Sequence, residues 1–180
     1  MDKPILAVDF EGAFLRRRPF QKAHEDWFRV MSVLLDDPSI MAYVTLENYF
    51  PKVYAVMKRY LGDVNASQHI YFARTLYAMA SVAEVREDDV IRDFADWLAG
   101  KKPQHALASI TTTPQHAVVP ILRKVNRADL FHIVYSSPEE KEPSKEQLFK
   151  EFIDRHGKPK FYICRGDNDV LVCKRLGVPT

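Results

Sequence analysis

A short apolar run that ends in two acidic residues and a glycine constrains the fold more than any other stretch. Residues 5–8 are all apolar and lie between Pro4 and Gly12. A run this short is typical of a strand that is buried on both faces, as in parallel sheets. Asp9 and Glu11 follow it directly, either as solvated turn residues or as functional groups. Ligands of open α/β sheets bind at the carboxyl ends of the strands, where these two acids would lie.

A long helical segment follows this first run. Apolar residues recur at helical spacing from residue 20 to residue 98. Stop signals at residues 36–38, at Gly62 and at Gly100 divide the segment into several helices. Apolar stripes of this kind more often form a core than a cofactor site. We therefore interpret the segment as a small all-helical unit.

Strands return after residue 104, and they alternate with helical stretches. The new apolar runs span residues 106–110, 130–135 and 160–164. This alternation predicts an α/β protein with a parallel sheet and right-handed crossovers, to which the first run also belongs. The predicted core domain comprises residues 1–16 and 101–180, and the inserted helical domain comprises residues 17–100.

Two helix starts in the second half of the chain carry capping signals. Thr113 is a predicted N-cap, with Pro114 at the first helical position. Ser144 opens a predicted capping box with Gln147. Both signals place a helix directly after a predicted strand or loop of the core.

Residues suited to phosphate or metal chemistry follow the predicted strands. Because parallel strands end at one edge of a sheet, we expect these side chains to converge. They are Asp9 and Glu11 after the first strand, Thr111 after the second, Lys141 and Lys145 before the last, and Asp167 and Asp169 after the last. Mg²⁺ prefers a few carboxylates with water and phosphate oxygens. A phosphoryl group in transfer needs cations and hydrogen-bond donors, and an aspartate can accept it covalently.

The same residues resemble the four motifs of the haloacid dehalogenase-like (HAD) hydrolase superfamily. The motifs appear here as A-V-D-F-E-G from Ala7 to Gly12, L-A-S-I-T ending at Thr111, E-K-E-P-S-K with Lys141 and Lys145, and R-G-D-N-D with Asp167 and Asp169. The order matches, and the helical insertion resembles the first-type cap of the family in position. The resemblance implies a Rossmann-like parallel sheet with an inserted helical cap.

The resemblance also implies the roles of the first motif. Asp9 would attack the phosphorus and hold Mg²⁺. Glu11 would be the general acid and base, and its backbone carbonyl would be a metal ligand. The family usually has a second aspartate at this position. Glutamate keeps the carboxylate and adds one methylene, as in the enolase-phosphatases, and it argues against the dehalogenase branch.

For the remaining motifs, the resemblance implies that Thr111, its neighbour Thr112 and a lysine bind the phosphoryl oxygens. Aligning Pro143 with the Lys-Pro pair of the family places a glutamate in the lysine position. Either Lys141 or Lys145 must then serve, and the alignment slightly favours Lys141.

The fourth motif is shorter than the common G-D-x-x-x-D. The resemblance implies that Asp167 completes the metal site directly. Asp169 would support that site or orient the lysine. Because the gap between the two aspartates is compressed, their division of labour stays open.

Composition excludes several other functions. The net charge of +2 is too small to indicate a nucleic-acid surface, and no apolar stretch is long enough to span a membrane. Cys164 and Cys173 have no zinc-ligand spacing and fit a reducing, cytoplasmic compartment. Asp2 and Lys3 lead directly into the first strand without a signal-peptide pattern.

Together these features predict a Mg²⁺-dependent phosphatase that hydrolyses a small phosphorylated metabolite through an aspartyl-phosphate on Asp9. One alternative is a non-catalytic binding or regulatory protein with the same fold. Another is a phosphotransferase or mutase that passes the phosphoryl group to a sugar or alcohol. No motif in the sequence specifies the substrate or the oligomeric state.

Overall fold

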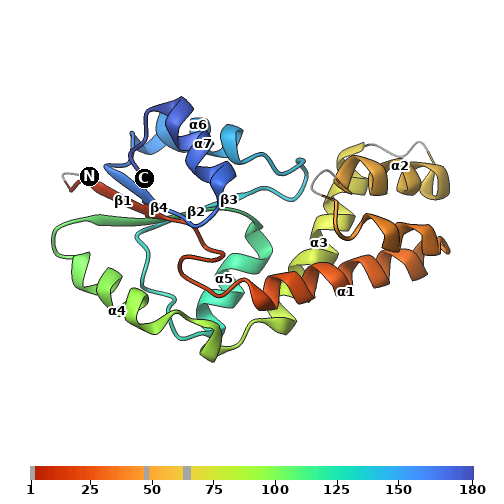
Figure 1. The fold of residues 1–180 in the computed structure, drawn as a ribbon, viewed down its shortest axis with the longest axis horizontal. Helices are drawn as coiled ribbons and strands as arrows, with labels where there is room; N and C mark the ends of the chain where they lie inside the picture. The colour runs from red at the N-terminus through yellow and green to blue at the C-terminus, as the bar shows by residue number, and fades with distance from the viewer. Residues whose placement is uncertain (1–2, 47–48, 63–65) are drawn as a thin grey trace.

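A parallel sheet forms the centre of the molecule. The computed structural model describes residues 3–46, 49–62 and 66–180. Its four strands are β1 (Ile5–Val8), β2 (Ala106–Pro114), β3 (Ile133–Ser137) and β4 (Phe161–Ile163), in the order β3-β2-β1-β4 (Figure 1). Leu6 of β1 pairs in parallel with Leu107 on one side and with Phe161 on the other. The predicted parallel α/β sheet is confirmed, with the first run as an inner strand.

Two apolar layers cover the faces of this sheet. Leu6 and Val8 belong to one layer, and Ile5 and Ala7 belong to the other. All four side chains are buried because neighbouring strands enclose β1 and helices cover both faces. The helices are α4 (Arg92–Lys101) and α5 (Gln115–Lys124) below the sheet in Figure 1, and α6 (Lys145–His156) and α7 (Asp167–Leu176) above it.

The segment between β1 and β2 is helical in all its regular elements that the structure describes. These are α1 (Arg18–Leu34), η1 (Pro38–Tyr43), α2 (Tyr49–Leu61), α3 (Ala66–Glu84), η2 (Glu87–Asp89) and α4. A third apolar cluster, which includes Trp27, Met31 and Met57, lies away from the sheet, at the right of Figure 1. We call the described part of residues 27–77 around this cluster the cap.

Part of the predicted helical domain packs on the sheet instead. Phe20 of α1, Ala78 of α3 and Leu98 of α4 lie in the same apolar cluster as Leu6. The helices α1 and α3 therefore each contribute one end to the core and the other end to the cap. The domain boundaries at residues 17 and 100 stay a prediction.

The chain just before α1 is hydrogen-bonded to the chain just after α3. The Arg16 backbone N–H donates to the Asp89 carbonyl at 2.9 Å, and the Ile91 N–H donates to the Phe14 carbonyl at 3.1 Å. Leu15 and Val90 form an antiparallel bridge between them. The chain after α3 thus returns to the chain before α1, and α4 then leads it to β2.

One of the two capping predictions is wrong, and of the other the cap by Ser144 is confirmed. β2 continues to Pro114, so α5 begins at Gln115 and Thr113 does not cap it. The Thr113 hydroxyl instead donates to a carboxylate of the site described below. Ser144 does cap α6, because its Oγ accepts from the Gln147 N–H at 3.3 Å. None of the helices described here is both long enough and apolar enough to span a bilayer.

Candidate active site

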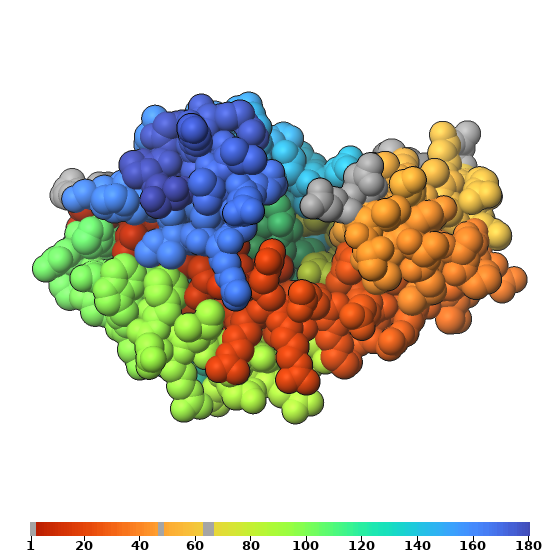
Figure 2. Space-filling model, in the orientation of Figure 1, coloured from red at the N-terminus to blue at the C-terminus, as the bar shows by residue number. Residues whose placement is uncertain are grey.

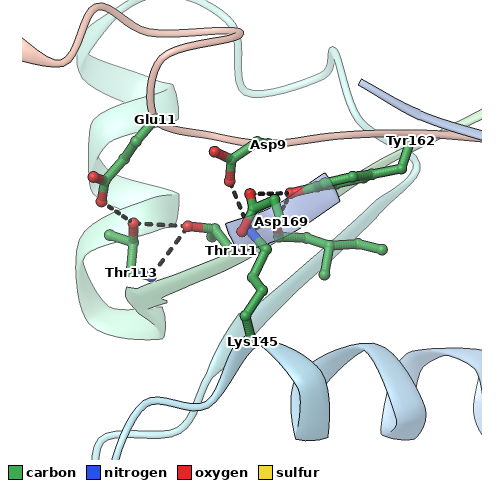
Figure 3. A network of polar contacts seen from close by, with 8 residues as sticks. Asp9, Glu11, Thr111, Thr113, Lys145, Tyr162 and Asp169 are labelled. Atoms are coloured by element: carbon green, nitrogen blue, oxygen red, sulfur yellow. Dashed lines mark hydrogen bonds and ion pairs between the residues drawn. The ribbon is translucent and has the colours of Figure 1, made fainter. Parts of the chain in front are cut away.

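A buried ion cluster lies at the carboxyl end of β1 (Figure 3). The Lys145 Nζ lies 2.8 Å from Asp9 Oδ1 and 3.2 Å from Asp169 Oδ2. It also donates to the Ile110 carbonyl at 3.1 Å. The side chains of Lys145, Asp9 and Asp169 are only 9%, 13% and 14% exposed. One ammonium is therefore shared by two carboxylates that come from opposite ends of the chain.

Tyr162 of β4 supports this cluster from within the sheet. Its hydroxyl donates to the Ile110 carbonyl at 3.2 Å and lies 3.3 Å from Asp169 Oδ2. Its ring lies 5.3 Å from the Lys145 Nζ, within cation–π range. The sequence analysis missed this residue. The available signal was a hydroxyl inside an apolar strand, since a buried tyrosine hydroxyl needs a hydrogen-bond partner.

A second polar chain connects β2 to Glu11. Thr113 Oγ1 donates to Glu11 Oε1 at 2.8 Å, and the Thr111 and Thr113 hydroxyl oxygens lie 2.8 Å apart. The Thr113 N–H donates to Thr111 Oγ1 at 3.1 Å. The two hydroxyls meet where the pairing of β2 becomes irregular, between Thr111 and Pro114. Thr113, which the sequence analysis assigned to a helix cap, is thus a site residue.

Burial shifts the titration of the acidic groups. Burial raises the pKa of Glu11 to about 7, and the nearby Asp9 adds to this, while the Thr113 hydrogen bond opposes it. Burial also raises the pKa of Asp9, against the opposing charge of Lys145. Burial alone would lower the pKa of Lys145, but Asp9 and Asp169 outweigh it and raise that pKa. Glu11 can therefore hold or release a proton near neutral pH, as a general acid and base must.

The stability of the metal-free protein should decrease with pH because of Glu11. Its carboxyl has a higher pKa in the folded state (about 7) than the ordinary value of 4.5. The folded state therefore binds more protons in this window, and the stabilisation is lost as pH rises through it. We expect a contribution of at most about 3 kcal/mol. Urea unfolding in EDTA at pH 5 and pH 8 measures it, and Glu11→Gln should flatten the dependence. An equally steep dependence in the variant would contradict the assignment.

The structure does not bring Lys141 to the cluster. Its side chain is 59% exposed, and its Nζ lies 3.6 Å from Glu151 Oε1. The geometry favours Lys145, against the preference drawn from the sequence alignment. The physical reason is that Lys145 begins α6, whose first turn faces Asp9, whereas Lys141 lies in the preceding loop.

The two aspartates of the fourth motif are also separated. Asp167 is an exposed residue at the start of α7, and Asp169 points to Lys145. Thr112 lines a cavity beside Glu11.

Within residues 3–46, 49–62 and 66–180, no three His, Cys, Asp or Glu side chains are grouped to hold a metal ion. Asp9 and Asp169 nevertheless share one cation, and Mg²⁺ is commonly bound by one or two carboxylates with water. The donor set therefore fits Mg²⁺.

Known structures with the same fold are HAD-like hydrolases. A predicted phosphatase from Clostridium acetobutylicum is 14% identical over 98% of this chain and 82% of its own, with a TM-score of 0.66. CbbY from Rhodobacter sphaeroides, solved in complex with phosphate, is 16% identical over 98% and 84%, with a TM-score of 0.65. The HAD-hydrolase YfnB from Bacillus subtilis, bound to magnesium, is 17% identical over 86% and 74%, with a TM-score of 0.50.

Other structures with a similar fold are described as HAD-like or HAD-superfamily hydrolases, so the chain has the fold of these proteins, as the motifs indicated. No protein-family model matches the sequence. No functionally curated protein matches it either. The family resemblance is therefore carried by the fold and by the residues that converge at the end of β1.

Proposed function

We propose that the protein is a phosphatase that hydrolyses a small phosphorylated metabolite through an aspartyl-phosphate on Asp9. The observation that carries the proposal is the buried cluster of Asp9, Lys145 and Asp169, with Glu11 two residues from Asp9. The cluster lies at the sheet edge where open α/β proteins bind their ligands. The HAD-like hydrolases with the same fold support the same reaction class.

In this proposal, Asp9 Oδ attacks the phosphorus and forms an oxygen–phosphorus bond. The bond from phosphorus to the leaving oxygen breaks, and Glu11 gives its proton to that oxygen. Glu11 then takes a proton from water, which attacks the phosphorus and releases phosphate and free Asp9. Lys145 neutralises charge on the phosphoryl oxygens throughout. A carboxyl with a pKa of about 7 suits both proton steps at neutral pH.

Asp9 and Asp169 would hold Mg²⁺, together with the backbone carbonyl of Glu11. Asp167 stays a candidate ligand, since it lies at the start of the same helix as Asp169. When bound, the ion would neutralise the phosphoryl oxygens during transfer. The magnesium found in YfnB supports this choice of cation.

Thr111 and Thr112 have different roles in the proposal. The Thr111 side chain is buried, and its hydroxyl is hydrogen-bonded to the Thr113 hydroxyl. It would therefore act on the phosphate only through this hydrogen bond. Thr112 lies in the lining of the cavity next to Glu11. We assign Lys145 as the phosphate-binding lysine and assign no such role to Lys141.

The proposal is tested by hydrolysis of p-nitrophenyl phosphate and of a panel of phosphorylated metabolites. Turnover should require Mg²⁺, fall to background in EDTA and return when Mg²⁺ is added in excess. The physical reason is that, without the metal, the two carboxylates outweigh the single ammonium of Lys145, and the net negative charge repels the anionic substrate. A rate that is equal in EDTA, or no turnover of any panel member, would contradict the proposal.

A further inference from the structure

A partly open cavity lies between the cap and the sheet, next to Glu11. Its volume is about 150 Å³. The surface is also set back between the blue C-terminal part and the orange cap in Figure 2. Aromatic side chains form much of the cavity wall, and one cation lines it. The residues used here are Glu11, Trp27, Tyr49, Phe50, Arg74 and Tyr77.

The cation is Arg74 of α3, and none of the described acidic side chains lies close enough to pair with it. Arg74 is only 5% exposed. Its Nη2 donates to the backbone carbonyls of Thr112 at 3.1 Å and Ser137 at 3.3 Å. Its Nε is buried without a hydrogen-bond partner. Among the described residues, no carboxylate oxygen lies within the 4.0 Å of an ion pair with Arg74.

Glu139 is a buried acid, but it does not form an ion pair with Arg74. Glu139 raises the pKa of Arg74 at longer range, against the larger lowering by burial. Its Oε1 instead accepts from the His116 N–H at 2.7 Å and lies 3.7 Å from His116 Nδ1. A buried charge without a close partner of opposite sign is energetically unfavourable, so an anion that pairs with it is favoured. The arginine thus has hydrogen-bonding capacity left for a ligand.

The position of the cavity indicates which part of the substrate would meet Arg74. A general acid must contact the leaving oxygen, so the leaving group lies beside Glu11. Glu11 is itself part of the cavity lining. A second hollow of about 570 Å³ also includes Glu11, but exposed residues such as Arg17, Gln21 and Glu25 line it. That hollow has solvated charges of both signs and no buried unpaired cation.

We propose that Arg74 binds a second negatively charged group on the leaving-group part of the substrate. The inference rests on the proposed function, because it takes Glu11 as the acid beside the leaving oxygen. The aromatic wall from Trp27, Tyr49 and Tyr77 would pack on the carbons between the two charged groups. A cavity of about 150 Å³ is about the size that holds one benzene molecule. The substrate class is therefore a short phosphate monoester that ends in a carboxylate or a second phosphate.

Calorimetry with phosphonates tests this class without hydrolysis. The three probes are propylphosphonate, 3-phosphonopropionate and propane-1,3-bisphosphonate, each titrated into the full chain with Mg²⁺. All three have the phosphonate for the Asp9 site, and only the last two have a second anion. We expect at least one of these two to bind about tenfold more tightly than propylphosphonate. Comparison of the two distinguishes a carboxylate from a second phosphate.

Variants of Arg74 make the test specific. In Arg74→Gln, the preference for the second anion should fall to within about twofold, since a neutral amide has neither the positive charge nor the two-pronged donor geometry of a guanidinium. Arg74→Lys should keep part of the preference. Arg123→Gln, on the exposed face of α5, is the matched control and should keep all of it. If Arg74→Gln does not fold, Arg74→Lys and the wild-type probe series still decide.

The outcomes separate the inference from the proposed function. If propylphosphonate binds and neither doubly charged probe binds more tightly, the inference is overturned and the phosphatase proposal stands. A preference that survives in Arg74→Gln also overturns it. If no probe binds, both the phosphoryl site and the inference that depends on it are wrong.

Discussion

Asp9→Asn should abolish turnover of p-nitrophenyl phosphate, with a loss of at least about 10⁴-fold in kcat. The amide is nearly the same size as the carboxylate, but its oxygen is neutral and cannot form the covalent bond to phosphorus. Asp169 still pairs with Lys145 at 3.2 Å in the variant, so the fold should persist. The thermal unfolding transition and the circular dichroism spectrum provide that control. An unchanged rate in the folded variant would show that the reaction occurs elsewhere in the molecule.

Lys145→Met should impair both activity and stability. Without the ammonium, Asp9 and Asp169 form a buried pair of like charges, and removing one partner of a buried ion pair costs about 3 kcal/mol or more. We expect a loss of at least about 10²-fold in kcat, because a cation on the phosphoryl group is missing. Urea unfolding in EDTA and steady-state kinetics in Mg²⁺ measure the two effects.

Lys141→Met is the matched control for this substitution. Its Nζ lies in an exposed pair with Glu151, so the change should alter stability by no more than about 0.5 kcal/mol. Activity should remain close to that of the wild type. The reverse pattern, with Lys141 essential and Lys145 dispensable, would restore the choice indicated by the sequence alignment.

The sheet could be predicted from local pattern because each strand is a short apolar run. Residues 5–8 show no alternation, and the structure buries both faces of β1. The strand ends then place Asp9 and Thr111 at one edge through topology alone. The convergence of functional residues was accessible from the sequence for this reason, before any distance was known.

Details of the site depended on contacts between distant segments. The sequence slightly favoured Lys141, and only the start of α6 at Lys145 decides for Lys145. Asp167 and Asp169 differ by two residues on α7, which places them on different sides of the helix. Local spacing cannot specify the helical phase relative to Asp9.

Two further residues had no local signal that distinguished them. Thr113 satisfies the sequence rule for an N-cap, but its hydroxyl donates to Glu11, which is far away in the chain. Arg74 lies in a stretch whose apolar residues indicated only a helix, and its role follows from burial against Thr112 and Ser137. Both cases are tertiary contacts that override or supplement a local preference.

The contact between residues 14–16 and residues 89–91 also bears on how the chain folds. Ile5 must find Ala106 to pair β1 with β2, and closing a loop of that length is entropically costly. The bridge between Leu15 and Val90 shortens the loop that must still be closed, because it already joins the chain before α1 to the chain after α3. If the helices assemble first, the sheet closes as though its two central strands were separated by a short connection. The sequence separation of β1 and β2 then overstates the entropy cost of pairing them. The sheet should therefore form faster than this separation implies.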